Sequence, residues 1–368
     1  MQQRVVVVGG GYGGVAVAKE LDDVAEVVLV EPKDAFVHAT AALRAAVDRD
    51  WQDRVFLPYD RLLAHGRVVH DRARLVAPGV VHLSAFESIE ADHIVLATGT
   101  GYPFPAKFLE DETSVAQARL DRLRADLARC DRVLVVGAGA VGLELAGELT
   151  TSFPHLAVTV VEQAQDILAG DYLPELRDGI REQLRHRAVT LLVGAGLGSL
   201  PPQDVGTYGP FTVRTAVGVS IDAQMWFRAY GSRPVTDYLH ATLRAGMHHD
   251  GTLPVTPQLN LVGQDRVWAV GDITDMAESK RATAAREHAG VVAQNIRDAL
   301  AGRAPSATYA PAPQLIVLPL GPRGGMSQIA GPDGNRVILG PEQTSAIKGA
   351  DLFAGSMADV LGRDVEPV

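Results

Sequence analysis

Glycines recur at fixed spacing at two places in the chain, in a pattern that can hold a nucleotide diphosphate. The first copy reads GGGYGG at residues 9–14, and the second reads GAGAVG at residues 137–142. In each copy the first glycine permits a tight turn, the second lets the backbone approach the diphosphate, and the third lets helix and strand pack closely. The glycines expected to play these parts are Gly9, Gly11, Gly14, Gly137, Gly139 and Gly142.

An acidic residue follows each glycine motif at the spacing that ribose recognition requires. Glu31 ends the apolar run 27–30, and Glu162 ends the run 158–161. An acid about 20 residues beyond the glycines accepts hydrogen bonds from a ribose in dinucleotide-binding folds. One such glycine motif alone is weak evidence, because glycine-rich turns are common. Two copies, each with its acid, predict two dinucleotide sites.

The segments around each motif have the order strand, turn and helix that such a site needs. Continuous apolar runs at residues 5–8 and 133–136 are typical of buried parallel strands, and they lead directly into the glycines. The helices expected at residues 15–21 and 143–149 would direct their N-terminal amides at the phosphates. No basic side chain is required there.

The composition indicates a globular protein with two or three domains. The chain has 368 residues, 47% of them hydrophobic, which allows sizeable cores. Its net charge of −10 disfavours nucleic acid or anionic lipid as the main partner. No apolar run approaches the roughly 20 residues that span a bilayer. Because the first strand begins almost at Met1, no room is left for a signal peptide, and we expect a cytoplasmic protein.

The chain has a single cysteine, Cys130, which suits a reducing compartment. It cannot form an internal disulfide or a dithiol pair. Cys130 either fills space before a strand or is a reactive thiol, and nothing nearby in the sequence would stabilise a thiolate. No metal site is expected.

The rest of the chain alternates short apolar runs with helical patterns. A strand at 92–97 should end in the turn Thr98-Gly99, and a third buried strand at 267–270 should end at Gly271-Asp272. The other expected elements are a charged helix within 110–129, a helix at 174–187, a strand at 189–193, a Gly/Pro-rich stretch at 194–210, meandering strands up to 230, a long helix within 279–300 and a linker at 303–313.

The order of these motifs resembles that of the apoptosis-inducing-factor-like FAD-dependent oxidoreductases, which are related to type II NADH dehydrogenases. The resemblance extends along nearly the whole chain, and the richness in Ala, Arg, Asp and Val resembles a bacterial member of high GC content. The segments that carry it are FVHATAALRAAV at 36–47, ATGTGYPFP at 97–105, GAGAVGLELAGEL at 137–149, VWAVGDI at 267–273, QIAG at 328–331 and DLF at 351–353.

The resemblance implies an α/β fold with two nested Rossmann-like dinucleotide-binding domains of the glutathione-reductase-like type. The FAD-binding domain is expected to be discontinuous, at residues 1–110 and 245–304. The NAD(P)H-binding domain would be residues 111–244. A small C-terminal segment, residues 305–368, is too short for a core of its own.

The resemblance also implies an activity, namely oxidation of NADH through FAD with electrons passed to a quinone or similar diffusible acceptor. In the wider pyridine nucleotide-disulfide oxidoreductase family, disulfide reductases pass electrons to a dithiol, which a chain with one cysteine lacks. The expected FAD contacts are Gly9, Gly11, Gly14, Glu31, Arg44, Val69, Thr98, Gly99 and Asp272, and the expected NADH contacts are Gly137, Gly139, Gly142, Glu144 and Glu162.

Charge predicts NADH in preference to NADPH. A carboxylate at Glu162 accepts from a free ribose 2′-OH but repels a 2′-phosphate. Arg185 or Arg187 could fold back and bind such a phosphate, which is the alternative.

Two residues are candidates for a part in catalysis. Lys280 could stabilise the negative charge of the reduced flavin, or it could be a solvated lysine. His288 and His38 fit packing roles better than catalytic ones. The segment 226–231 departs from the family's second ATG-like turn, because Tyr230 replaces a small residue. Tyr230 could shield the flavin, admit a different substrate, or simply repack.

Two other functions stay open alongside the quinone reductase. One is a flavin-dependent tailoring oxidoreductase of a biosynthetic pathway, motivated by the Tyr230 segment. The other is a redox-sensing protein that binds FAD and NADH but has little turnover. The acceptor, the pathway and the oligomeric state are not given by the sequence.

Membrane attachment should be at most peripheral, at the inner face. Gln2 follows the initiator methionine, whereas myristoylation requires glycine there. An apolar face near the C-terminus could lie on a bilayer or pack on the flavin domain, and the acids Asp351 and Asp359 favour packing. This face is formed by Ala350, Phe353, Met357, Val360 and Leu361.

Overall fold

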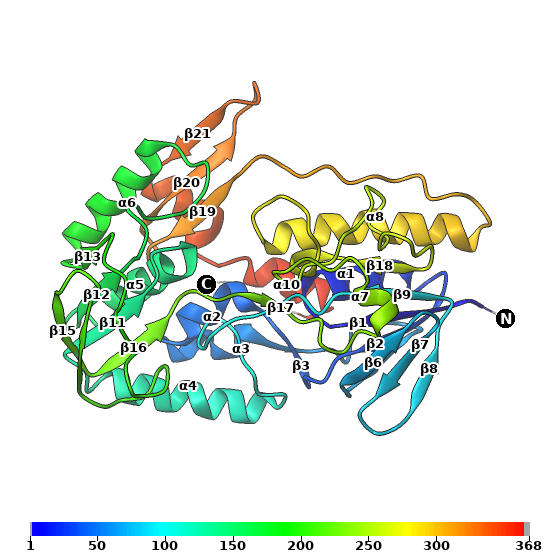
Figure 1. Ribbon diagram of the computed structural model, residues 1–368, viewed down its shortest axis with the longest axis horizontal. Coiled ribbons are helices and arrows are strands. Elements are labelled where there is room, and N and C mark those ends of the chain that lie inside the picture. Colours follow the sequence, from blue (N-terminus) through cyan, green and yellow to red (C-terminus); the bar gives the residue numbers. More distant parts are fainter. Residues whose placement is uncertain (1, 364–368) are drawn as a thin grey trace.

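Two parallel sheets organise the chain, one around each glycine motif (Figure 1). In the computed structural model, which describes residues 2–363, the strand orders are β18-β9-β1-β2-β5 and β13-β12-β11-β16. The predicted α/β fold with two dinucleotide-binding units is confirmed. The first sheet consists of β1 (Arg4–Val8), β2 (Glu26–Val30), β5 (Arg67–Val69), β9 (His93–Leu96) and β18 (Val267–Ala269), and the second of β11 (Arg132–Val136), β12 (Ala157–Val161), β13 (Thr190–Leu192) and β16 (Met225–Arg228).

The first sheet is covered on both faces, which explains its continuous apolar strands. Alternate residues of β1 face two separate cores. One core lies under the helices α1 (Tyr12–Leu21) and α8 (Ala282–Leu300), which pack against each other. The other lies under an antiparallel sheet and the helix α7 (Ala241–Arg244). That sheet consists of β6 (Ala73–Ala77), β7 (Val80–Leu83) and β8 (Ser88–Glu90).

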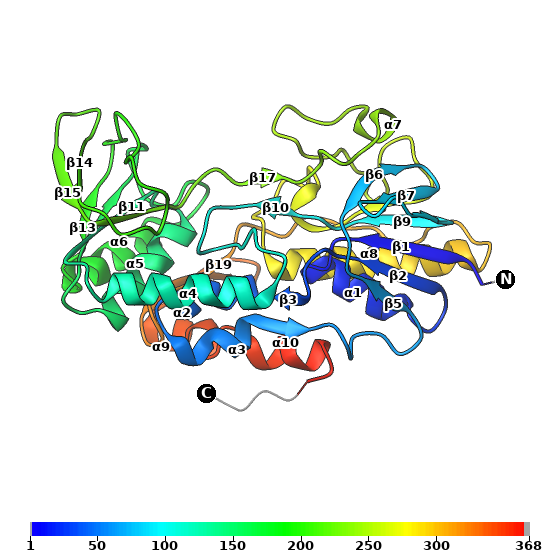
Figure 2. The same cartoon turned by 90° about the horizontal axis from the view of Figure 1, so that it is seen from below.

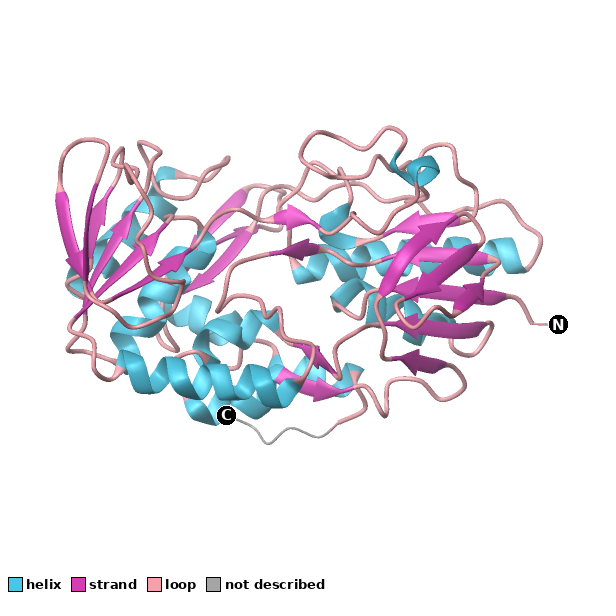
Figure 3. Cartoon of the chain, turned by 60° about the horizontal axis from the view of Figure 1, so that its bottom comes forward, coloured by secondary structure: helices cyan, strands magenta, loops and turns pink. Residues whose placement is uncertain are grey.

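The second sheet is covered in a similar way. The helices α4 (Thr113–Leu127), α5 (Ala140–Ser152) and α6 (Pro174–His186) contribute to the core on one face. The hairpin of β14 (Phe211–Arg214) and β15 (Ser220–Ala223) covers the other face. Figure 3 shows this hairpin standing apart from the helices. We expected meandering strands here, but β16 runs parallel to β11 and completes the sheet.

The two units are joined at a narrow crossing and along a helical contact. The strands β10 (Thr100–Gly101) and β17 (Arg233–Pro234) pair antiparallel where the chain leaves and re-enters the first unit. Residues soon after β17, including Tyr238 and Leu243, already lie in a core of the first unit. We therefore propose that the second boundary falls near β17 rather than at residue 244.

A helical segment of the first unit reaches across to the second. It consists of β3 (Ala35–Val37), α2 (Ala39–Ala45), η1 (Arg49–Trp51), α3 (Gln52–Val55) and β4 (Phe56–Pro58). Apolar residues of α2 and α3 lie in the same core as α4 and α5, and α2 packs against α5. This contact fixes the two glycine motifs relative to each other.

The C-terminal segment returns along α8 and then packs on the second unit (Figure 1). Its sheet, which the sequence did not reveal, packs against α5 and α6. Met357 of α10 (Ala354–Val360) and Leu361, which follows this helix, are buried in the core under α1. This confirms packing on the first unit for this part of the apolar face, and Figure 2 shows α10 beside that unit. The elements are β19 (Ile316–Pro319), β20 (Gly325–Ala330), β21 (Arg336–Leu339), α9 (Pro341–Thr344), the π-helical turn η3 (Ser345–Gly349) and α10 (Ala354–Val360).

Candidate dinucleotide sites

The first glycine motif forms an open cradle at the N-terminus of α1. Gly9 has φ +106°, and a Cβ there would lie 2.6 Å from the carbonyl carbon of Ala97. A Cβ on Gly14 would lie 1.9 Å from the carbonyl oxygen of Gly9. A Cβ on Gly11, in contrast, would have no described atom within 4 Å. The first and third glycines are thus required by the fold, whereas the middle one leaves space for a phosphate.

The second motif repeats this geometry at the N-terminus of α5. Gly137 has φ +110°, and its Cβ would lie 2.7 Å from the carbonyl oxygen of Ala229. A Cβ on Gly142 would lie 2.0 Å from the carbonyl oxygen of Gly137, and one on Gly139 would again meet nothing within 4 Å. Both cradles therefore fit a dinucleotide diphosphate.

Glu31 lies beside the first cradle, as predicted. One carboxylate oxygen accepts from the Gly10 amide at 2.6 Å, and the other accepts from the Lys33 amide at 3.0 Å. Burial raises the pKa of Glu31. Each oxygen keeps a lone pair that a ribose hydroxyl can use. The Val69 carbonyl accepts from the Glu31 amide at 3.0 Å, so Val69 borders this site through its backbone.

Glu162 has the same arrangement beside the second cradle. Its two oxygens accept from the amides of Ala138 at 2.7 Å and Ala164 at 2.9 Å. The loop after each second strand is thereby tied to its own glycine turn. The carboxylate is held in place and still has free lone pairs for a ribose.

A turn at the end of a neighbouring strand closes each cradle. In the first unit Ala97 donates to the Val8 carbonyl, and in the second Ala229 donates to the Val136 carbonyl, both at 2.8 Å. Tyr230 therefore occupies the place that Thr98 has in the first unit. Its side chain is 42% exposed, so it has not repacked into the protein core.

Thr98 and Gly99 join the first site to the crossing between the units. The Thr98 hydroxyl donates to the Val235 carbonyl at 2.8 Å and lies 2.9 Å from the Tyr238 hydroxyl. Gly99 has φ +59°, and a Cβ there would meet nothing within 4 Å. The turn is thus fixed by the returning chain and open on the other side.

Asp272 belongs to a cluster that includes a cation the sequence did not reveal. It lies in the short helix η2 (Gly271–Ile273) and accepts from the Thr100 hydroxyl at 3.1 Å. The Lys107 ammonium lies 4.0 Å from the same Asp272 oxygen and donates to the Thr100 carbonyl at 2.5 Å. Burial lowers the pKa of Lys107. The spacing of Lys107 in the sequence gave no signal, because the crossing strand brings it there.

Arg44, an expected FAD contact, is held by groups of α5 and of the C-terminal segment. Its guanidinium is buried, and it binds Glu148 on α5 with Nε at 3.1 Å and one terminal nitrogen at 2.8 Å. The other terminal nitrogen donates to the Gly349 carbonyl at 2.7 Å. Its Cζ also lies 4.7 Å from the ring centre of Trp51. Arg44 therefore links α2, α5 and η3, and does not point into the first cradle.

Glu144 lies one turn before Glu148 on α5 and is also paired. The Lys348 ammonium donates to its two oxygens at 3.0 and 3.3 Å, and both side chains are largely buried. The sequence did not single out Lys348, which is 204 positions away along the chain. The Lys348–Glu144 ion pair thus holds the C-terminal segment against α5 beside the second motif, one turn from the Arg44–Glu148 pair that holds α2 there.

Lys280 is placed outside these clusters. It is exposed, and its ammonium donates to the Thr274 carbonyl at 2.7 Å, which braces the loop before α8. This geometry favours the solvated alternative over a catalytic one.

His288 on α8 positions the turn that carries Asp272. Its Nδ1 accepts from the Gly271 amide at 3.0 Å, and its Nε2 donates to Glu278 at 2.9 Å. Tyr309, in the linker after α8, donates to the other Glu278 oxygen at 2.7 Å. Burial lowers the pKa of His288, which keeps the ring neutral and its Nδ1 free to accept.

His38 makes a second buried contact of this kind. Its Nδ1 accepts from the Tyr12 hydroxyl at 2.9 Å, and its Nε2 donates to the Leu352 carbonyl at 2.8 Å. Because Tyr12 belongs to the first glycine motif, His38 ties that motif to the C-terminal segment. Burial lowers the pKa of His38 to about 4.

We expect His38 to make the protein less stable in acid. The unfolded chain binds a proton at His38 below about pH 6.5, but the folded protein does so only near pH 4. The stability that neutral His38 contributes is therefore complete above about pH 6.5 and is lost as the pH falls toward 4, by roughly 3 kcal/mol in all. The melting temperature should fall between pH 7.5 and about pH 5, and this fall should be smaller for His38→Gln than for the parent. Equal falls would contradict this role.

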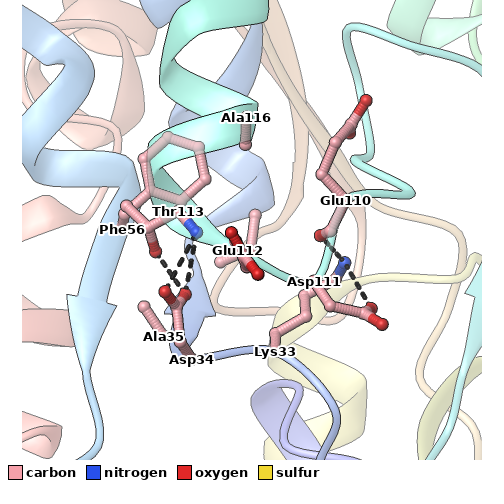
Figure 4. Close-up of a pocket in the computed structure, with 10 residues that line it drawn as sticks. Lys33, Asp34, Ala35, Phe56, Glu110, Asp111, Glu112, Thr113 and Ala116 are labelled. Carbon is pink, nitrogen blue, oxygen red and sulfur yellow. Dashed lines mark hydrogen bonds and ion pairs between the residues drawn. The ribbon is translucent and has the colours of Figure 1, made fainter.

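The loop after Glu31 is tied to the start of α4 (Figure 4). Asp34 accepts from both the amide and the hydroxyl of Thr113, and Lys33 donates to the Glu110 carbonyl at 2.5 Å. Asp111 lies 3.9 Å from the same Lys33 ammonium. This cluster, drawn in Figure 4, fixes the edge of the first site where the chain crosses to the second unit.

Cys130 follows α4 in the chain and is buried, as expected for a residue that fills space before a strand. Its thiol donates to the Asp126 carbonyl at 3.3 Å, and burial raises its pKa to about 11. A thiolate is therefore disfavoured.

Within residues 2–363, no group of His, Cys, Asp and Glu could hold a metal ion. None of the helices in these residues combines the length and the apolar character that crossing a bilayer requires.

Known proteins with similar sequences share this architecture. A family profile described as pyridine nucleotide-disulphide oxidoreductase matches residues 3–289. Ferroptosis suppressor protein 1 of Taeniopygia guttata is 32% identical over 98% of this chain and 96% of its own length. Apoptosis-inducing factor homolog A of Dictyostelium discoideum is 27% identical over 89% of this chain and 85% of its own.

A solved structure shows the same fold at low sequence identity. NDH2 of Plasmodium falciparum, in complex with NADH, superposes with a TM-score of 0.71 at 11% identity, covering 94% of this chain and 93% of that one. With the two cradles, their acids and these relatives, the protein is a FAD-dependent NAD(P)H oxidoreductase. The chain belongs to the pyridine nucleotide-disulphide oxidoreductase family.

Proposed function

We propose that the protein oxidises NADH at the second cradle, reduces FAD held at the first, and passes the electrons to a quinone. The observation that carries this proposal is the pair of matched cradles, each with an open middle glycine and a fixed carboxylate. FAD bound at the first cradle would supply the redox chemistry, accepting hydride and releasing electrons to the acceptor. The protein supplies binding, orientation and charge.

The first site would hold FAD through groups on three elements. The amides at the start of α1 would face the phosphates, and Glu31 would accept from a ribose hydroxyl. Asp272 accepts from Thr100 and keeps a second oxygen for a polar group of the cofactor. Lys107 supplies a positive charge beside Asp272, so the cluster can bind an anionic group without a net negative field.

The second site would hold NADH in the same way, with α5 and Glu162 in these roles. Glu144 stays a proposed contact, and in the protein it is paired with Lys348. A 2′-phosphate could alternatively be bound by Arg185 or Arg187, but neither side chain folds back toward Glu162. Arg185 pairs with Glu182 at 2.6 Å on the surface, and Arg187 donates to the Leu320 carbonyl at 2.6 Å.

We expect NADH to be used at least about tenfold more efficiently than NADPH, because Glu162 would repel a 2′-phosphate. Glu162→Ala should lower kcat/KM for NADH about tenfold and reduce the ratio of the two efficiencies. Steady-state kinetics with both nucleotides measure this. Glu175→Ala, an exposed acid at the start of α6, is the control and should leave the ratio unchanged. An equal efficiency for NADPH in the parent would refute the assignment.

The electrons must leave for a molecule outside the chain, because the single cysteine is buried and its thiolate disfavoured. The resemblance to type II NADH dehydrogenases supports a quinone. We propose that the protein works in the cytoplasm and meets a membrane-borne quinone peripherally. The exposure of Tyr230 beside the second cradle supports the second candidate, a tailoring oxidoreductase with another acceptor.

The test is anaerobic reduction of the purified holoprotein by NADH, followed by addition of one acceptor at a time. Rapid bleaching of the flavin and rapid recovery with a short-chain quinone are expected. Recovery only with another small oxidant would favour the tailoring enzyme. Bleaching without turnover by any acceptor would favour a redox sensor, and a protein that does not bind FAD would refute the proposal.

A further inference from the structure

Arg228 is a charged residue at the end of an otherwise apolar strand. The preceding residues of β16, including Trp226 and Phe227, are buried in the cores of the second unit. In the register of the sheet, Arg228 lies opposite Val136, the residue before the second glycine motif. It thus stands at the carboxyl edge of the sheet, where open α/β sheets bind their ligands.

The fold does not require a cation at this position. The corresponding residue of the first unit is Leu96, which lies opposite Val8 in the matching register and is buried. The two turns that follow, at Ala97 and Ala229, have the same hydrogen bond to the central strand. A leucine is therefore compatible with this geometry, and the arginine calls for another explanation.

Arg228 is half-buried, and one donor of its guanidinium has no acceptor in the described part of the chain. Its Nε is buried and has no hydrogen-bond partner among residues 2–363. Its neighbours are aromatic, since the Cζ of Arg228 lies 5.7 Å from the ring centre of Tyr230. Tyr102 of the first unit is near enough to be affected by the positive charge of Arg228. That charge lowers the pKa of Tyr102, whereas burial has the larger effect and raises it to about 12. An enclosed donor without an acceptor is unfavourable, so a ligand acceptor is expected.

The position of β16 in the sheet indicates which part of a ligand would reach it. In the order β13-β12-β11-β16, the strand that carries Glu162 lies on one side of β11 and β16 lies on the other. A dinucleotide with its adenosine ribose at Glu162 and its phosphates at Gly139 would continue over β16. The part that continues is the nicotinamide half.

We propose that Arg228 binds the nicotinamide half of NADH, through phosphate and ribose oxygens, and so sets the affinity of the second site for the dinucleotide. A planar guanidinium suits phosphate oxygens, and Tyr230 forms an exposed aromatic wall beside it. This inference rests on the proposed function, because it takes the second cradle as the NADH site. A carboxylate of the electron acceptor is the competing ligand for the same charge.

Calorimetric titration of the oxidised holoprotein with NAD⁺ and with AMP tests the inference. AMP keeps the adenosine half and lacks the nicotinamide half. Arg228→Gln should weaken NAD⁺ binding about tenfold or more and leave AMP binding unchanged, and Arg228→Lys should fall between the parent and Arg228→Gln. Arg214→Gln, an exposed arginine at the end of β14, is the matched control and should bind both ligands as the parent does.

The outcomes separate this inference from the proposed function. Equal NAD⁺ affinity in the parent and Arg228→Gln overturns the role of Arg228, and leaves the NADH site in place. Weaker binding of AMP as well as NAD⁺ also overturns it, because the substitution would then disturb the whole site. A parent that binds neither NAD⁺ nor AMP refutes the assignment of the second cradle itself. The retained flavin spectrum reports that each variant is folded.

Discussion

Gly11→Val is expected to give a folded but colourless protein. Gly11 has φ −76° and ψ −169°, which a residue with a side chain adopts without strain. A Cβ there meets no described atom within 4 Å, so the protein itself can accept the change, at about 1 kcal/mol for a poorer helix cap. The new side chain would occupy the space left for the FAD phosphates. We expect the affinity for FAD to fall at least a hundredfold.

The matched variant is Gly139→Val, because Gly139 has φ −76° and ψ −176° and equally open surroundings. It should keep FAD and lose reduction by NADH. Gly14→Val is the opposite case, since its Cβ would lie 1.9 Å from a backbone oxygen, and it should not fold normally. Circular dichroism and the flavin content of the purified proteins measure the outcome. Full FAD occupancy in Gly11→Val would contradict the assignment.

Arg44→Met is expected to destabilise the protein by about 3–5 kcal/mol, because it leaves Glu148 buried without its partner. Both side chains of the pair are almost fully buried, and burial already raises the pKa of Glu148. The double variant Arg44→Met with Glu148→Met should regain much of this stability, since no buried charge is left unpaired. Urea unfolding of the holoproteins gives the free energies.

Arg49→Ala is the control for this prediction. Arg49 pairs with Asp121 on the surface and its side chain is 70% exposed, so its loss should change the stability by less than about 1 kcal/mol. If Arg44→Met were as stable as the parent, the contact between α2 and α5 would not depend on this pair. Arg44→Met would in that case not loosen the packing of the two units against each other.

The sequence was sufficient for the parts of the site that are local and repeated. The two glycine motifs, Glu31 and Glu162 each lie within one strand-turn-helix unit, so their spacing determines their geometry. The open turn at Gly99 and the turn at Asp272 were also found, since each directly follows a buried strand. The ion pair of Arg44 was not foreseen, because its partner, Glu148, is 104 positions away and no local pattern shows it.

Distant pairing also explains what the sequence did not reveal. Lys107 reaches Asp272 across the crossing strands, and Lys348 reaches Glu144 from the C-terminal segment. The sheet β19-β20-β21 was overlooked because its outer strands, β19 and β21, are only four residues long and partly buried. The helices α4 and α8 begin a few residues inside the stretches in which they were expected. At α4 the Thr113 amide is held by Asp34, which lies far away in the sequence.

The key test of electron flow from the second cradle to the first is to mix Gly139→Val anaerobically with NADH. The visible absorption of the flavin then measures how fast the flavin is reduced. If NADH must bind at the second motif to reach the flavin, we expect a yellow protein that dithionite reduces fully, but that NADH reduces at least a hundredfold more slowly than it reduces the parent. Reduction of Gly139→Val by NADH at the parental rate would contradict it, because NADH would then reach the flavin without the second glycine motif.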